Sequence, residues 1–412
     1  MLGLDDTVVE RVEFDELAQV VVAHVRPGRG QRARCGRCGR PSAGYDGGAG
    51  RRRWRALDLG TVRAVVEAAA PRVRCVEHGV VVAALPWARH GAGHTRCFDA
   101  QIAWLAVQTS KSAVTALMRI AWRTVGAIVN RVLADLLAGK DPLEGLRRIG
   151  IDEISYRRGY EYLTIVVCHD SGRLVWACPG RDRATVRRFF DQLGPARAGL
   201  LTHVSADGAR WISDVVVEKA PNAIRCTDPF HVVSWATDAL DEVRRAAWNT
   251  ARAGQKPRAR NKNTATGAAR TLKRARWALW KNPNNLTDAQ RTKLAWIAAN
   301  DHRLYRAYLL KEGLRLIYAL PVTEAAHALN TWLGWAQRSR IPAFVALGRR
   351  VRAHRPAILA AIEHDLSNAL IESTNTKIRL ITRRAYGFAR TDHLIALATL
   401  ALGNHKPALP GR

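Results

Sequence analysis

The sequence predicts a multidomain α/β protein in which a small β-rich domain and a group of short helices precede a larger α/β core. Three observations lead to this fold class. Two short pairs of potential metal ligands occur early in the chain, short apolar strands recur between residues 149 and 227, and residues 232–365 are helical in pattern and strongly basic. A chain of 412 residues also exceeds what one hydrophobic core usually organises.

The charge of the chain indicates the class of its partner. Sixty-five Lys and Arg against 35 Asp and Glu give a net charge of +30, although 48% of the residues are hydrophobic. A globular protein this basic is expected to act on a polyanion, and double-stranded DNA is the main candidate. An anionic membrane surface would attract the same charge, but no basic amphipathic anchor, transmembrane span or secretory signal stands out.

The cysteines indicate a compartment. Seven unevenly spaced cysteines are too few for a disulfide scaffold. We therefore expect a reducing cytoplasm, where a DNA-binding chain would be associated with the nucleoid.

Residues 1–93 are predicted to form a zinc-binding β-rich domain. Residues 8–14 and 19–25 alternate as strands do, and two knuckles follow, each with two ligands at i and i+3 before a glycine. The expected ligands of a structural Zn²⁺ are Cys35, Cys38, Cys75 and His78. The alternative is two unrelated turns with incidental thiols. The basic residues 51–55 between the knuckles suit phosphate contacts or a solvated face.

Residues 94–140 are predicted to form a helix-turn-helix. Helical patterns cover residues 99–107, 111–118 and 122–137, and only a short break separates the last two. A longer second helix after such a break is typical of a motif whose last helix enters the major groove. The residues expected to face DNA are Arg123, Thr124, Ala127, Asn130 and Arg131. An ordinary helical linker without DNA contacts is the alternative.

Residues 141–240 are predicted to begin the catalytic core. Asp152 stands in the middle of a β-branched run, where an ionised acid costs several kcal/mol unless it is paired or metal-bound. The alternative is a strand-edge position beside one of the many arginines. Further strands are expected at 160–168, 173–178, 201–206 and 223–227, with a helix at 184–193. Three antiparallel strands, a crossover helix and further strands are the order of a ribonuclease-H-like sheet. Its first and fourth strands are neighbours, which would bring Asp152 and Asp207 together.

Residues 241–362 are predicted to form a helical domain inserted into this core, because a five-stranded sheet needs no such excursion to reach its last helix. Its most basic stretch, residues 252–276, is expected to lie along nucleic acid. The DNA-binding candidates there are Arg258, Arg260, Lys262, Lys273 and Arg276. If the stretch were only a mobile loop, the first three could be neutralised without loss of DNA affinity.

Residues 363–412 are predicted to complete the core. Ser367 can cap a helix with an apolar stripe, and Glu372, Asn375 and Arg379 lie on the flank of that stripe, at the rim of a cleft. The basic residues expected to contact DNA here are Lys377, Arg379 and Arg383. A surface ion pair between Glu372 and one of these arginines is the alternative.

Asp152, Asp207 and Glu372 together form one hypothesis. Magnesium takes oxygen ligands and keeps several waters, so convergent carboxylates on a rigid sheet and helix suit Mg²⁺ or Mn²⁺. Two such ions about 3.5 to 4 Å apart can activate a nucleophile and stabilise the leaving oxygen in phosphodiester attack.

The chain resembles the ISL-three family of insertion-sequence transposases over nearly its whole length. The matching residues are Cys35-x-x-Cys38 and Cys75-x-x-His78, Lys111-Ser-Ala-Val with Trp122-Arg-Thr-Val-Gly, Gly150-Ile-Asp-Glu, Ser205-Ala-Asp-Gly, Asp228-Pro-Phe-His-Val-Val, and Ser367-Asn with Ile371-Glu372, Asn375 and Arg383-Arg-Ala-Tyr-Gly-Phe. His78 departs from the family, whose fourth knuckle ligand is usually a cysteine.

The resemblance implies a DDE transposase that binds inverted-repeat ends, cuts DNA to expose 3′ hydroxyls and joins them to a target strand. It also implies that Asp152, Asp207 and Glu372 hold the metal, with Asp228 and His231 beside the active site. Asp228 is a rival second ligand, although it also suits a helix cap before Pro229. Pairing two DNA ends would require at least a homodimer. The competing functions are an inactive repressor of element ends and a nuclease that cleaves without joining.

Overall fold

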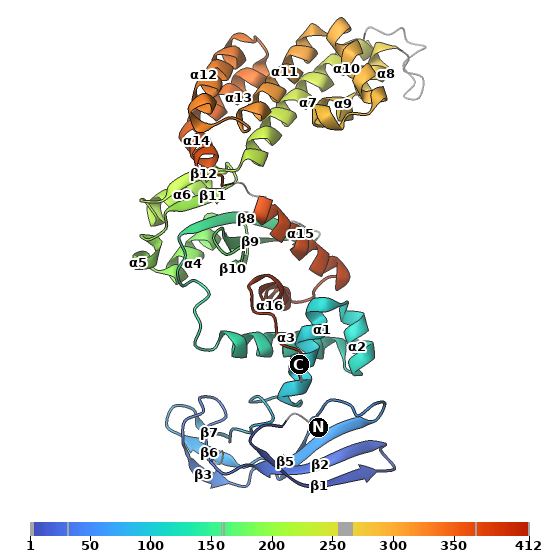
Figure 1. Cartoon of the computed structure of the whole chain (residues 1–412), viewed down its shortest axis with the longest axis vertical. Helices are drawn as coiled ribbons and strands as arrows, with labels where there is room; N and C mark the ends of the chain where they lie inside the picture. The colour runs from blue at the N-terminus through green and yellow to red at the C-terminus, as the bar shows by residue number, and fades with distance from the viewer. Residues whose placement is uncertain are drawn as a thin grey trace. The chain divides into compact units, whose positions relative to one another are not determined.

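The computed structural model describes residues 4–30, 33–157, 159, 161–253, 267–366 and 369–410 (Figure 1). The chain divides into two compact units. The first unit comprises residues 1–142, 173–175 and 376–412, and the second comprises residues 143–172 and 176–375.

The first unit begins with two β-sheets. The larger sheet has the strand order β1-β2-β5-β4, formed by β1 (Thr7–Asp15), β2 (Val20–Pro27), β4 (Arg51–Arg55) and β5 (Arg63–Ala69). The smaller sheet has the order β3-β6-β7, formed by β3 (Ala43–Asp46), β6 (Arg72–Cys75) and β7 (Gly79–Val82). Trp54 and Trp87 are buried edge to face against the larger sheet, with ring centroids 5.7 Å apart. This β-rich region confirms the fold predicted for the N-terminal part.

Helices complete the first unit. They are α1 (Arg96–Gln108), α2 (Lys111–Met118), α3 (Trp122–Leu137) and α16 (Thr391–Leu402). The Thr95 and Ser110 side chains cap α1 and α2, and α2 and α3 are bent by 100°, within the range of a helix-turn-helix. Among the described residues no single helix combines the length and apolar character needed to cross a membrane. Only α2 and α3 taken together, which are bent at their junction, have the length and composition of such a span.

The second unit is built on a five-stranded sheet with the order β10-β9-β8-β11-β12. Its strands are β8 (Arg148–Arg157), β9 (Glu161–Cys168), β10 (Leu174–Pro179), β11 (His203–Ala206) and β12 (Ile224–Thr227). Strand β8 pairs antiparallel with β9 and parallel with β11, and β11 pairs parallel with β12. The first and fourth strands are therefore neighbours, as the ribonuclease-H-like order requires. Helices α4 (Arg183–Leu193) and α6 (Arg210–Lys219) pack on each other, and the short α5 (Pro195–Ala198) lies between them in sequence.

A helical region follows β12 within the second unit (Figure 1). Its elements are α7 (Pro229–Ala253), α8 (Ala268–Lys273), α9 (Arg276–Trp280), η2 (Pro283–Asn285), α10 (Asp288–Asn300), α11 (His302–Ile317), α12 (Val322–Arg338), α13 (Pro342–Ala353) and α14 (Arg355–Glu363). They share one apolar core. Inside it, the buried Lys311 pairs with Glu312 and donates to the Leu279 carbonyl at 2.9 Å, so its charge is compensated.

Helix α15 (Ala369–Arg384) carries its residues up to Asn375 in the second unit and the rest in the first. Residues 376–412 thus group with the helix-turn-helix, because Leu397 and Leu400 of α16 share a core with Phe98 and Ile128. This grouping differs from the predicted placement of residues 363–412 in the catalytic core. The four boundaries between the five predicted segments stay a prediction.

Candidate functional site

Four sulfur and nitrogen ligands converge in the first unit. Cys38 Sγ lies 3.7 Å from Cys75 Sγ. His78 Nδ1 lies 3.6 Å from Cys75 Sγ and 3.8 Å from Cys35 Sγ. Ligands held tetrahedrally at about 2.3 Å from zinc are about 3.8 Å apart, so the spacing fits a structural zinc ion. The hydrogen bond with His78 lowers the pKa of Cys75 to about 6, which favours a thiolate at neutral pH.

A row of acids follows the paired parallel strands of the second unit. Ile151 of β8 pairs with Ala206 of β11, which in turn pairs with Thr227 of β12. The next residue after each of these is an aspartate. Because these parallel strands are in register, Asp152 within β8 lies level with Asp207 and Asp228, which directly follow β11 and β12, and the three acids form one row.

Helix α15 adds Glu372 and Asn375 to this row. A Cβ atom built on Gly150 would lie 2.1 Å from Ile371 Cδ1, so the glycine allows α15 to approach β8 closely. Asn375 Nδ2 donates to Asp152 Oδ2 at 2.7 Å. Glu372 lies one turn earlier than Asn375 on the same helix face. The sequence motif that contains Glu372 and Asn375 therefore meets the distant motif that contains Asp152.

The acids of this site influence one another through their charges. Burial raises the pKa of Asp152, and the negative charge of Asp207 acts in the same direction. Burial also raises the pKa of Glu372, with further contributions from Asp228 and Asp152. The carboxylates are thus near enough to repel. In the described part of the chain, however, the Cys and His atoms form the one potential ligand group gathered within 4.8 Å, and the carboxylates do not.

Asp228 and His231 form a pair beside this row. Asp228 is 1% exposed and accepts from the Phe230 backbone N–H at 3.2 Å, as a helix cap does. Its other oxygen lies 2.7 Å from His231 Nδ1, and this hydrogen bond raises the pKa of His231. Asp207 is more exposed and accepts a hydrogen bond from the Ala209 backbone N–H at 2.9 Å. Asp228 thus has hydrogen bonds to Phe230 and His231, and the more exposed Asp207 is more accessible as a metal ligand.

Glu153 is an acid of the site that the sequence analysis did not identify. Its side chain is only 5% exposed, Arg181 lies 3.4 Å away, and its Oε1 atom is buried without a hydrogen-bond partner. Burial raises the pKa of Glu153 to about 7, and the charge of Asp207 contributes. The one feature of the sequence that could have identified Glu153 is its position directly after Asp152. Alternation along a strand predicts that the two side chains lie on opposite faces of the sheet, but it does not reveal which residues bury Glu153.

The helical region supports the loop that carries Asp207. A Cβ atom on Gly208 would lie 2.1 Å from the Trp235 ring of α7, so only glycine fits beneath that indole. The Arg350 guanidinium of α13 stacks 3.6 Å above the same ring. Burial lowers the pKa of Arg350, and Asp207 acts against this shift. The helical region thus places a cation near the acid row.

The predicted DNA-binding residues differ in the exposure of their side chains. Arg258, Arg260 and Lys262 lie outside the described residues. The residues with exposed side chains are Arg123, Ala127, Lys273, Arg276, Lys377, Arg379 and Arg383, and Thr124 is half-buried. The Arg276 guanidinium lies 3.8 Å from the Trp280 ring centroid, which fixes its direction.

Two of the predicted DNA-binding residues on α3 have partners within the protein in this structure. Arg131 donates through Nε and Nη2 to the two oxygens of Asp99, both at 3.0 Å. Asp99 is fully buried, so its charge requires this cation, and Arg89 at 3.3 Å adds a second. Asn130 is half-buried and donates to Asp392 at 3.3 Å. Both side chains therefore connect α3 to other helices of the first unit, and their contact with DNA stays a prediction.

Three family profiles match successive parts of the chain. Residues 31–78 match one described as the zinc-finger of transposase IS204/IS1001/IS1096/IS1165. Residues 83–133 match the helix-turn-helix domain of transposase family ISL3, and residues 149–398 match an ISL3 profile described as transposase.

Whole proteins are similar as well. The transposases for insertion sequence element IS1557 from Mycobacterium tuberculosis strains CDC 1551 / Oshkosh and ATCC 25618 / H37Rv are each 58% identical over 427 aligned residues, covering 100% of this chain and 96% of the relative. The transposase for insertion sequence element IS1001 from Bordetella parapertussis is 29% identical over 278 residues, covering 67% of this chain and 66% of the relative.

Proposed function

Because this chain belongs to the ISL3 family of insertion-sequence transposases, we propose that it binds the inverted-repeat ends of its element and cuts and joins DNA strands with divalent ions. The proposal rests on Asp152, Asp207 and Glu372, and its support is that β8 and β11 pair in register beside the two aspartates and that α15, which carries Glu372, packs closely on Gly150 of β8. A helix-turn-helix and a transposase domain imply DNA as the partner.

Asp152, Asp207 and Glu372 would hold two Mg²⁺ or Mn²⁺ ions, which supply Lewis-acid activation of the nucleophile and stabilise the leaving oxygen. Their donor set is hard oxygen, which suits these ions. Asn375 holds Asp152 by its hydrogen bond and so fixes the direction of one carboxylate. Asp228 keeps His231 oriented and favours its protonated form, which places a positive charge beside the phosphate to be cut.

The proposed DNA contacts come from several elements. Arg123 and Thr124 stand at the start of α3, the part of a recognition helix that reaches base edges. Exposed cations on α8, α9 and α15 would contact phosphates, which position the protein without reading sequence. The candidates are Lys273, Arg276, Lys377, Arg379 and Arg383. Arg258, Arg260 and Lys262 remain proposals for the same role.

The test is to incubate the protein with Mg²⁺ and DNA that carries an element end beside a labelled flank. A transposase releases a 3′ hydroxyl at the end and joins it to a target strand. An inactive repressor would bind and leave the DNA intact, and a simple nuclease would cut without a joined product. Cross-linking of the DNA complex tests the proposed homodimer, since two ends held together require two copies.

A further inference from the structure

An exposed tyrosine follows the end of helix α15 in the first unit, and the proposed active site does not use it. The Tyr386 N–H donates to the Arg383 carbonyl at 3.1 Å, and the Gly387 N–H donates to the Thr382 carbonyl at 2.9 Å. These two bonds form a Schellman motif, in which Tyr386 occupies the left-handed position with a φ of 52°. Glycine is the usual residue at this position, because a side chain strains the backbone there.

The fold gains little from this side chain. Tyr386 is 84% exposed, and its side chain has no hydrogen bond or ring contact among the described residues. It is also the one aromatic residue with a positive φ in the described part of the chain. A strained backbone position that carries an exposed ring indicates a role outside the fold.

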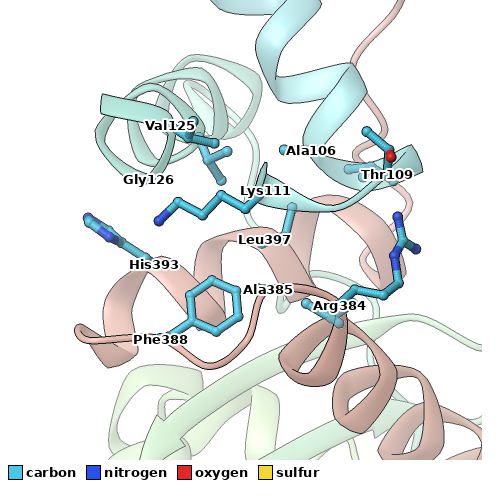
Figure 2. Close-up of a pocket in the computed structure, with 13 residues that line it drawn as sticks. Ala106, Thr109, Lys111, Val125, Gly126, Arg384, Ala385, Phe388, His393 and Leu397 are labelled. Atoms are coloured by element: carbon cyan, nitrogen blue, oxygen red, sulfur yellow. The ribbon is translucent and has the colours of Figure 1, made fainter. Parts of the chain in front are cut away.

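The residues on either side of the tyrosine are anchored, so the ring is held on a fixed turn. Ala385 is buried, and Phe388 packs on the apolar core that α1, α3 and α16 share. Figure 2 shows Ala385 and Phe388 at the cavity that Val125 and Gly126 of α3 also line. The turn therefore belongs to the helix-turn-helix region, and Tyr386 extends from it into solvent.

The neighbouring side chains of α15 are basic. Arg379 and Arg383 are exposed in its last two turns, and neither has an acidic partner within the residues that the structure describes. The helix dipole explains a cation in the last turn, but it does not explain an exposed aromatic ring. Cations and an aromatic ring together are typical of a nucleic-acid surface, where phosphates pair with the cations and a base or sugar packs on the ring.

We propose that Tyr386 packs its ring on a nucleotide of DNA, while Arg383 binds an adjoining phosphate. The proposal rests on the proposed function, because it adds a contact to the DNA that the helix-turn-helix binds. The ring contributes contact area without charge. Its contribution to affinity is therefore independent of salt, whereas that of the arginine is weakened by salt.

The experiment measures DNA affinity in EDTA at several salt concentrations, so a failure of cleavage does not affect it. The probes are a blunt duplex that carries an element end and the same duplex with an unpaired tail. Tyr386→Gly is expected to weaken binding about 10-fold without changing the slope of log K against log salt. A loss confined to the tailed duplex would assign the contact to an unpaired base, and equal losses on both probes would assign it to a deoxyribose of the duplex.

A measurement of stability separates this role from a structural one. Tyr386→Gly relieves the left-handed strain, so its melting temperature is expected to rise by about 2 °C although its affinity falls. Tyr386→Phe keeps the ring and should retain most of the wild-type affinity. The matched control is Asn404→Gly, which makes the same backbone change at an exposed left-handed position after α16, with a φ of 62°, and should leave DNA affinity unchanged.

Three results would overturn the proposal. Wild-type affinity of Tyr386→Gly for both probes would show that the ring does not contact DNA. A lower melting temperature of Tyr386→Gly would show that the fold requires the ring, and an equal loss of affinity in Asn404→Gly would assign the effect to the backbone. A wild-type chain that bound neither probe would overturn the proposed function as well.

Discussion

The two candidate metal centres of this chain differ in how completely their ligands are assembled. The atoms of Cys35, Cys38, Cys75 and His78 all lie within 4.8 Å of one another. Asp152, Asp207 and Glu372 share a sheet edge and influence one another electrostatically, but in the described residues they do not converge to that extent. The difference follows from charge. Sulfur and imidazole ligands can pack together, as the hydrogen bond between Cys75 and His78 shows, whereas close carboxylates repel and are stabilised by a cation.

This comparison suggests two kinds of metal binding. In the zinc ribbon the ion is part of the fold, because a small β-sheet with few apolar residues needs it. In the acid row α15 is held on the sheet by apolar packing, since Ile371 is fully buried against Gly150 of β8.

The largest expected effect comes from removing a zinc ligand. Cys75→Ser is expected to abolish stoichiometric zinc and unfold the smaller sheet, because structural zinc contributes about 10 to 16 kcal/mol in comparable peptides. Elemental analysis and amide hydrogen exchange of residues 43–82 measure both outcomes. Cys97→Ser, outside the cluster, is the control and should retain zinc. Full zinc content in Cys75→Ser would contradict the assignment of Cys75 as a ligand of a structural zinc ion.

A second prediction concerns the buried Glu153, whose ionisation is expected to lower the free energy of unfolding. The pKa of Glu153 is raised from 4.5 to about 7, so the folded chain binds more protons than the unfolded chain between these values. Stability is therefore expected to fall as pH rises through this window. Glu153→Gln removes the ionisable group and should stabilise the protein by up to about 3 kcal/mol at pH 8, with little effect at pH 4.

Thermal unfolding at the two pH values checks this effect in metal-free buffer. Glu324→Gln on α12 makes the same chemical change at an exposed glutamate and should shift neither midpoint. Equal midpoints for wild type and Glu153→Gln at pH 8 would show that Glu153 is not strained.

Patterns in the sequence were sufficient for most elements and for the neighbouring strands beside Asp152 and Asp207. The predicted helices at 111–118 and 122–137 have the observed bounds of α2 and α3, because Ser110 caps the first and the second has a regular apolar stripe. The cysteine knuckles gave the zinc ligands, since metal geometry fixes their spacing. The strand order gave the Asp152–Asp207 row, because only neighbouring parallel strands end at one edge.

The features that the sequence did not reveal have a common physical cause. Helical spacing places Arg131 near Arg123 and Thr124, but spacing could not reveal that Asp99 of another helix is buried and requires a cation. Glu153 was missed for the same reason, as its burial depends on what packs over it. Sequence patterns predict which residues share one face of a helix or strand, and tertiary contacts decide which residues pack against that face.

The smallest expected effect is at Asn375. Asn375→Ala removes the hydrogen bond to Asp152 Oδ2 and should destabilise the second unit by about 1 to 2 kcal/mol. It should also lower the cleavage rate while leaving DNA affinity unchanged. Denaturant unfolding and single-turnover cleavage measure the two quantities, and Thr376→Ala at the adjacent exposed position is the control. A cleavage rate equal to wild type would mean that Asn375 does not orient Asp152.

A change of metal preference tests the central claim most directly. Cysteine prefers softer ions than carboxylate does, so Asp152→Cys, Asp207→Cys and Glu372→Cys should lose cleavage with Mg²⁺ and recover at least about 10-fold with Mn²⁺. Asp228→Cys should show no such recovery. The same low activity with both ions in all three variants, or recovery in Asp228→Cys and not in Asp207→Cys, would contradict the assignment of these acids as the metal ligands.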